Sequence, residues 1–150
     1  MRSAYRVLAY VVAVEVVIQA AAISYALAGL GKWVSDGGTL DKAAMESEDT
    51  TFTGVVGFIV HGINGQMLIP LLAVILLIIS FFAKIPGGAK WAGLILLLVV
   101  IQVLLGLFSS GIPQLAILHG ANALALFAAA VYAGRRVAAH SQVPAEQQNA

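Results

Sequence analysis

The apolar residues of this chain are gathered into four long blocks that are separated by short segments rich in polar residues, Gly or Pro. The blocks cover about residues 7–27, 53–83, 91–108 and 115–134. A helix needs about 20 apolar residues to cross the hydrocarbon core of a bilayer. The pattern therefore predicts an all-α fold with four transmembrane helices in one domain, residues 1–136, followed by a disordered cytoplasmic tail, residues 137–150.

The first block has a second interpretation, because it follows Arg2 and Arg6 and because Ala26-Leu27-Ala28 resembles a signal-peptide cleavage site. The apolar region of a signal peptide is typically about 7–15 residues long. This block is longer and contains Glu15 and Gln19. We therefore interpret it as a retained helix.

Charge predicts the orientation of the four helices. One side of the predicted bundle carries six Lys and Arg residues and the other carries two, Lys32 and Lys42; the six are Arg2, Arg6, Lys84, Lys90, Arg135 and Arg136. Because cytoplasmic loops are enriched in these residues, both termini are expected in the cytoplasm and residues 28–52 outside. We expect a multi-pass protein of a bacterial plasma membrane.

The connections after the second and third blocks are short and contain Gly and Pro, which is typical of tight turns. They make successive helices antiparallel neighbours, so the prediction is an up-down-up-down four-helix bundle. Pro70 lies inside the second block and predicts a kink there.

The composition favours a membrane environment and excludes several classes of partner and cofactor. The chain is 61% hydrophobic and 10% charged, with a mean hydropathy of +0.96, whereas soluble domains are about 45–50% apolar. The lipid bilayer is the expected partner, and without a basic cluster no nucleic acid is expected. The absence of Cys excludes disulfides, iron–sulfur clusters and covalently attached haem.

Two short sequences each occur twice, in the same order, in the two halves of the chain. Val16-Val17-Ile18-Gln19 recurs as Val99-Val100-Ile101-Gln102, and His61-Gly62-Ile63-Asn64 recurs as His119-Gly120-Ala121-Asn122. We interpret the chain as two tandem helical hairpins related by a pseudo-two-fold axis along the membrane normal. Gln19 and Gln102 would then face each other near mid-depth, with His61 and His119 closer to the outside.

The paired histidines predict a haem site. His61 and His119 supply two imidazoles from facing helices, which is too few for a structural zinc site but enough for the two axial positions of haem b. Gly54, Gly57, His61 and Gly65 share one helical face, so Gly57 and Gly65 are predicted to line a groove for the porphyrin. The alternative is a small-residue seam for helix packing.

Asn64 and Asn122 follow the histidines by three residues, and they either support the ligands or bind a neighbouring helix. Glu15 is the only acidic residue inside a predicted span and lies one turn before Gln19. Together with Gln102 these residues form a polar layer, which suggests a quinone or another lipophile as an alternative ligand.

The four-span layout and the placement of His61 and His119 on the second and fourth helices resemble one half of a haem A synthase. In that family, histidines on even-numbered helices ligate haem. Many members also carry a glutamate near the ligands and a cysteine pair in the first outer loop, whereas this chain has Phe58-Ile59-Val60 before His61 and no cysteine. The resemblance therefore implies a stand-alone or homodimeric b-type cytochrome that acts in electron transfer or haem handling. The remaining alternative is a cofactor-free accessory subunit of a larger respiratory or transport complex.

Overall fold

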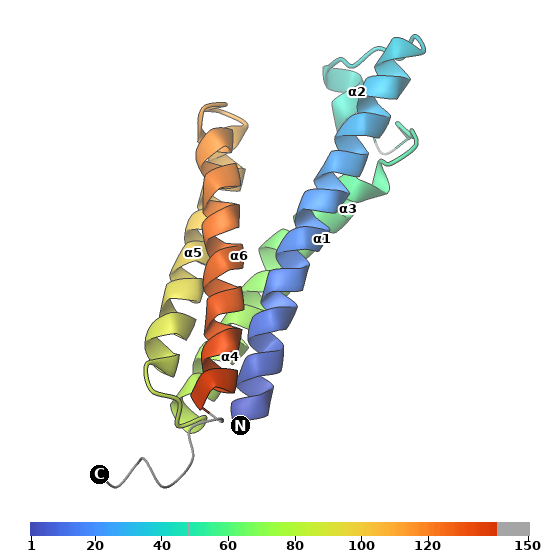
Figure 1. Cartoon of the computed structure of the whole chain (residues 1–150). Helices are drawn as coiled ribbons and strands as arrows, with labels where there is room; N and C mark the ends of the chain where they lie inside the picture. Colours follow the sequence, from blue (N-terminus) through green and yellow to red (C-terminus); the bar gives the residue numbers. More distant parts are fainter. Residues whose placement is uncertain (48, 141–150) are drawn as a thin grey trace, which may run out of the picture.

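The computed structural model describes residues 1–47 and 49–140, and the regular elements within them are all helical (Figure 1). In chain order they are α1 (Arg2–Ser35), α2 (Lys42–Glu46), α3 (Val56–Ile63), the π-helical turn η1 (Asn64–Leu68), α4 (Ile69–Phe82), α5 (Gly88–Ser109) and α6 (Leu115–His140). Since α3, η1 and α4 follow one another without a break, they form one continuous helix.

Four of these helices within the described residues are long and apolar enough to cross a membrane. They cover Arg2–Ser35, Val56–Phe82, Gly88–Ser109 and Leu115–Val137. They pack against one another with alternating direction, so that α6 ends at the end of the molecule where α1 begins (Figure 1). The all-α fold, the four spans and the multi-pass class that the sequence predicts are thus confirmed.

Hydrogen bonds link the helices at one end of the molecule, which we call the closed end. At this end α1 begins and the turn between α4 and α5 lies. The Tyr5 hydroxyl donates a hydrogen bond of 3.0 Å to the carbonyl of Gly88, and Arg136 donates one of 3.2 Å to the carbonyl of Pro86. The turn between α4 and α5 reverses through Lys84 and Gly87, which have positive φ angles of 50° and 71°.

The hydrophobic core fills the closed half of the bundle, where α1 packs on α4 and α6, and α5 packs on α4 and α6. Many core residues are alanines, which let membrane helices approach closely. The core consists of Tyr5, Ala9, Val12, Ala13, Ile69, Ala73, Leu76, Ala83, Ala92, Ile95, Val99, Leu126, Ala129, Ala130, Ala133 and Val137.

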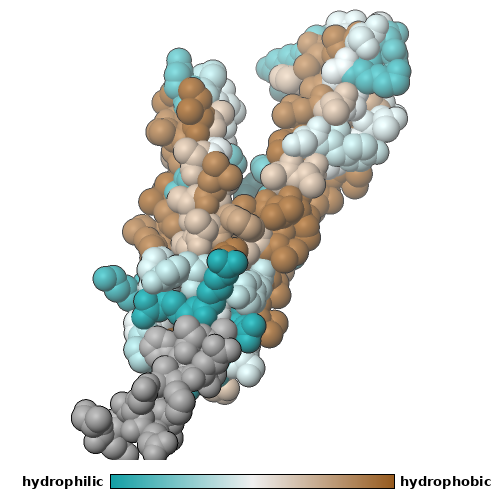
Figure 2. All heavy atoms as spheres, in the orientation of Figure 1, coloured by the Kyte–Doolittle hydropathy of each residue, from teal (hydrophilic) through white to brown (hydrophobic). Residues whose placement is uncertain are grey.

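Towards the other end, the open end, the molecule divides into two arms (Figure 1). The second half of α1 and α3 form the first arm, and the paired α5 and α6 form the second; Figure 2 shows an open crevice between them. Glycines explain the first arm, because Gly54 and Gly57 bring α3 directly onto the backbone of α1. The four helices therefore form a bundle only along the closed half.

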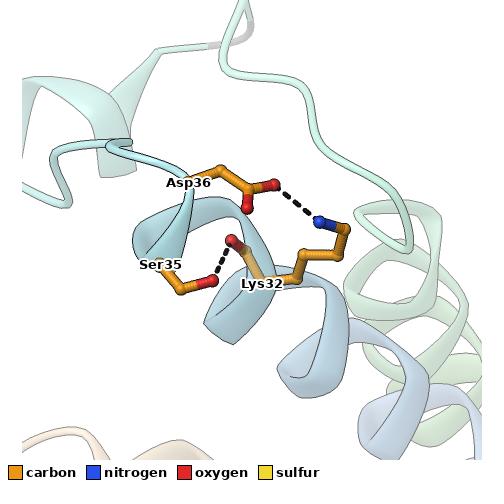
Figure 3. Close-up of polar contacts among 3 residues, drawn as sticks. All are labelled: Lys32, Ser35 and Asp36. Carbon is orange, nitrogen blue, oxygen red and sulfur yellow. Dashed lines mark hydrogen bonds and ion pairs between the residues drawn. The ribbon is translucent and has the colours of Figure 1, made fainter.

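The helix ends differ from the predicted spans. α1 continues through Ser35 into the predicted external loop, and its last turn is polar: the Lys32 ammonium pairs with Asp36 at 2.8 Å and Ser35 Oγ donates to the Lys32 carbonyl (Figure 3). Both charged groups of this pair are exposed, so it stabilises little. α6 continues through His140, into the segment predicted as tail, and residues 141–150 lie outside the described residues.

An irregular turn interrupts the second span beside Pro70. In η1 the amide of Ile69 bonds to the carbonyl of Asn64, five residues back. Pro70 follows at the start of α4 and has no N–H to offer the preceding turn. A π-turn is one of the known sources of helix distortion, and here it follows His61 by three residues and contains Gly65 and Gln66, which line the candidate site.

Candidate cofactor cleft

His61 on α3 and His119 on α6 reach the crevice between the arms, and each is held by the first helix of its own hairpin. Nδ1 of His61 lies 3.2 Å from the backbone carbonyl oxygen of Gln19, and Nδ1 of His119 lies 3.0 Å from that of Gln102. A carbonyl oxygen can only accept, so each Nδ1 carries the proton and donates. Nε2 is then the basic nitrogen of both rings, and it is available as a metal ligand.

The two rings face each other across the crevice. Their centroids are 6.2 Å apart and their planes are inclined by 59°. An imidazole nitrogen binds a metal ion at about 2 Å and lies about 1 Å from its ring centroid, so two imidazoles on opposite sides of one metal have centroids about 6 Å apart. The observed centroid separation of 6.2 Å is compatible with that distance.

The cavity around these rings has a volume of about 190 Å³ and opens into the crevice between the arms (Figure 2). Its walls are mostly apolar, with three glutamines and the two histidines as polar groups. The lining residues are Val16, Gln19, His61, Gly62, Gly65, Gln66, Ile69, Val99, Gln102, Val103, Gly106, Leu107, His119, Ala123 and Leu126.

Two glycines of the stripe that was predicted to form a porphyrin groove pack against α1. A Cβ atom at Gly57 would collide with the carbonyl oxygen of Ala22, and one at Gly54 would lie 2.7 Å from that of Tyr25. Gly57 is therefore part of a packing seam between α3 and α1, the alternative that the sequence left open, and it is not among the residues that line the cleft. Gly65 lies against the Gln19 side chain and also lines the cleft.

Two glycines that sequence reasoning did not select, Gly62 and Gly106, line the cleft beside the histidines. A Cβ atom on Gly106 would lie 3.1 Å from Cε1 and 3.3 Å from Nδ1 of His119, so its hydrogen makes room for the ring. Gly106 lies one turn after the repeated Gln102, and this spacing is the sequence feature from which its place beside His119 could have been predicted.

Each of the two asparagines hydrogen-bonds to the first helix of its own hairpin. Binding of a neighbouring helix is one of the two roles that the sequence predicts for them. Asn122 Nδ2 donates to the Leu98 carbonyl at 2.9 Å and to the side-chain oxygen of Gln102 at 2.7 Å. Asn64 Nδ2 donates to the carboxyl group of Glu15 at 2.8 Å. Glu15 and Leu98 each precede the repeated glutamine by four residues, so the two asparagines bind equivalent positions.

This difference leaves Gln19 without the partner that Gln102 has. The Gln19 side chain lines the cleft, its residue is 8% exposed, and among the described residues neither its amide nitrogen nor its amide oxygen has a hydrogen-bond partner. A buried amide without partners is costly. The two halves of the cleft therefore differ in that the Gln102 side-chain oxygen accepts a hydrogen bond, whereas the buried Gln19 side-chain oxygen accepts none among the described residues.

The donor set fits one class of metal centre. No group of three or more His, Asp or Glu side chains that could hold a metal ion occurs in the described part of the chain. Two opposed nitrogen ligands suit an iron whose other four ligands come from a porphyrin. The cleft residues fit haem on the separation of the rings, on the free Nε2 atoms and on the glycines beside them.

Comparison of the chain with protein-family models, with curated proteins and with solved structures finds no match.

Proposed function

We propose that this chain is a membrane-embedded b-type haem protein in which His61 and His119 are the axial ligands. The observation that carries the proposal is the 6.2 Å separation of the two ring centroids. The Nδ1 contacts to the Gln19 and Gln102 carbonyls support it, because metal-bound histidines almost always donate their second N–H in this way.

The open crevice between the arms offers space for a porphyrin (Figure 2). The cavity of about 190 Å³ is smaller than the about 300–1,000 Å³ of a typical cofactor site. The open crevice between the arms would have to hold the rest of a porphyrin (Figure 2). Val16, Val99 and Leu126 form an apolar floor of the cavity.

Bound haem would supply one-electron redox chemistry. The chain would hold the iron through Nε2 of both histidines, fix the two rings through backbone carbonyls, and keep water from the iron with the apolar floor. These features suit electron transfer or haem handling in the membrane, which is also what the resemblance to half of a haem A synthase implies.

The test is the absorption spectrum of protein purified from haem-replete cells. We expect a Soret band and, after reduction, the sharp α and β bands of six-coordinate haem. His61→Ala and His119→Ala should each lose the six-coordinate spectrum, and the double variant should lose the haem. The third histidine provides the control, since His140→Ala should leave the spectrum unchanged. Colourless wild-type protein would refute the proposal.

A second candidate, a lipophile with a carbonyl or hydroxyl group such as a quinone, is favoured by the free Gln19 amide. A short-chain ubiquinone is a suitable probe. Gln19→Leu should weaken its binding by about tenfold, the equivalent of one lost hydrogen bond. The Gln102 side-chain oxygen already accepts from Asn122, so Gln102→Leu should weaken binding less for the quinol form, whose hydroxyl group donates to such an oxygen. Equal affinity in Gln19→Leu and wild-type protein would exclude this candidate.

A further inference from the structure

We propose that the two ligands are not equivalent: His119 holds the haem permanently, whereas His61 is releasable, so that the reduced protein binds a diatomic ligand such as carbon monoxide on the His61 side. This inference rests on the proposed haem function.

His119 is fixed on several sides. Its Nδ1 donates to the Gln102 carbonyl at 3.0 Å, and its ring lies against the backbone of α5 at Gly106. The Gln102 residue that accepts this bond is itself held, because Asn122 binds its side chain at 2.7 Å. The ring, its acceptor and the acceptor's side chain thus form one connected network.

His61 has fewer constraints. Its Nδ1 also contacts a backbone carbonyl, that of Gln19 at 3.2 Å, but the Gln19 side chain has no hydrogen-bond partner among the described residues, and Asn64 is bound to Glu15 instead. The position equivalent to Gly106, four residues after Gln19, is Ile23, which does not line the cleft. The first half therefore lacks the network that holds His119.

The helices that carry the two histidines differ in the regularity of their hydrogen bonding, and again His119 has the more fixed position. His119 lies on α6, a regular helix of 26 residues that begins after the short turn from α5. His61 lies on the continuous helix formed by α3, η1 and α4, three residues before the π-turn η1 interrupts its regular hydrogen bonding. Helix segments with irregular hydrogen bonding open at lower free energy than regular ones. The first arm is therefore the one that can withdraw its ligand.

The exchange needs no oxidant or reductant beyond the haem already reduced. With haem bound, His61 would be the residue that leaves, as a neutral imidazole that keeps its lone pair, and carbon monoxide would take its place, while His119 would keep its hold. The Gln19 residue lines the cleft on this side, and its buried amide has no partner among the described residues, so the amide would have to turn towards the cleft to donate a hydrogen bond to the bound ligand.

The experiment uses the reduced, haem-loaded full chain and carbon monoxide as the probe. Wild-type protein should give the difference spectrum of a carbon monoxide adduct. His61→Ala should keep its haem and bind carbon monoxide faster, whereas His119→Ala should retain at least about tenfold less haem than His61→Ala, in line with the loss of a fixed ligand.

The carbon–oxygen stretching frequency of the adduct tests whether carbon monoxide binds on the His61 side of the haem. Gln19→Leu should raise this frequency because it removes the hydrogen bond to the ligand, and Gln102→Leu should leave it unchanged. A protein with the six-coordinate spectrum that does not bind carbon monoxide, or equal haem loss in His61→Ala and His119→Ala, would overturn this inference alone. Absence of the Soret band would instead refute the proposed function.

Discussion

The Asn64 side chain donates a hydrogen bond of 2.8 Å to the carboxyl group of Glu15, and this contact breaks the symmetry of the two hairpins. In the second hairpin Leu98 occupies the position of Glu15, and Asn122 binds the Gln102 amide instead. The Gln102 side-chain oxygen thus accepts a hydrogen bond, whereas the Gln19 side-chain oxygen, in the hairpin that carries Glu15, accepts none among the described residues.

Glu15→Leu should therefore convert the first hairpin to the pattern of the second. Asn64 would lose its present acceptor and would turn to the Gln19 side-chain oxygen, so we expect a loss in the free energy of unfolding of less than about 1 kcal/mol. Asn64→Leu leaves Glu15 without a partner in the membrane and should cost more, about 1–3 kcal/mol. Equilibrium unfolding in detergent measures both values. A larger loss for Glu15→Leu than for Asn64→Leu would contradict the exchange of partners.

Gly106→Ala should lower the haem content of the protein without unfolding it. The added methyl group would lie 3.1 Å from Cε1 of His119, so the ring must shift by a few tenths of an ångström, which would weaken its hold on the proposed haem. Gly93 lies on the same helix and has open space around its Cβ position, so Gly93→Ala is the matched control. The measurement is the ratio of Soret to protein absorbance, and equal ratios in the two variants would show that Gly106 does not position His119.

Gly57→Ala should destabilise the first arm, because its methyl group would collide with the carbonyl oxygen of Ala22 on α1. Overpacking of this kind costs about 1–3 kcal/mol. The control is Gly31→Ala, which meets no atom within 4 Å. Thermal unfolding of the purified variants should separate the two. If Gly57→Ala unfolds at the wild-type temperature, the close approach of α3 to α1 is not needed for stability.

The orientation expected from the distribution of Lys and Arg can be tested by single-cysteine labelling, since the chain contains no cysteine of its own. Thr39→Cys lies on the exposed segment after α1, and Ala89→Cys lies at the turn that begins α5. In intact cells a membrane-impermeant maleimide should label Thr39→Cys, and it should label Ala89→Cys only after permeabilisation. The reverse pattern would place the termini outside.

The sequence alone determined the four spans, their alternating direction and the pairing of the two hairpins. Hydropathy and helix length are local properties, because each span must bury its backbone polar groups within itself. The repeated motifs also indicated that His61 and His119 belong together, and the structure brings them to 6.2 Å between centroids.

Only the tertiary structure decided how far the hairpins stay together and which side chains keep a partner. The assignment of Gly57 to the seam and of Gly106 to the cleft depends on the rotation of each helix about its axis, which a repeating pattern of small residues does not specify. The free amide of Gln19 depends on a choice of partner by Asn64, which is made by distance and geometry. The pairing of the two histidines could therefore be predicted from the sequence, whereas the difference between their surroundings is visible only in the tertiary structure.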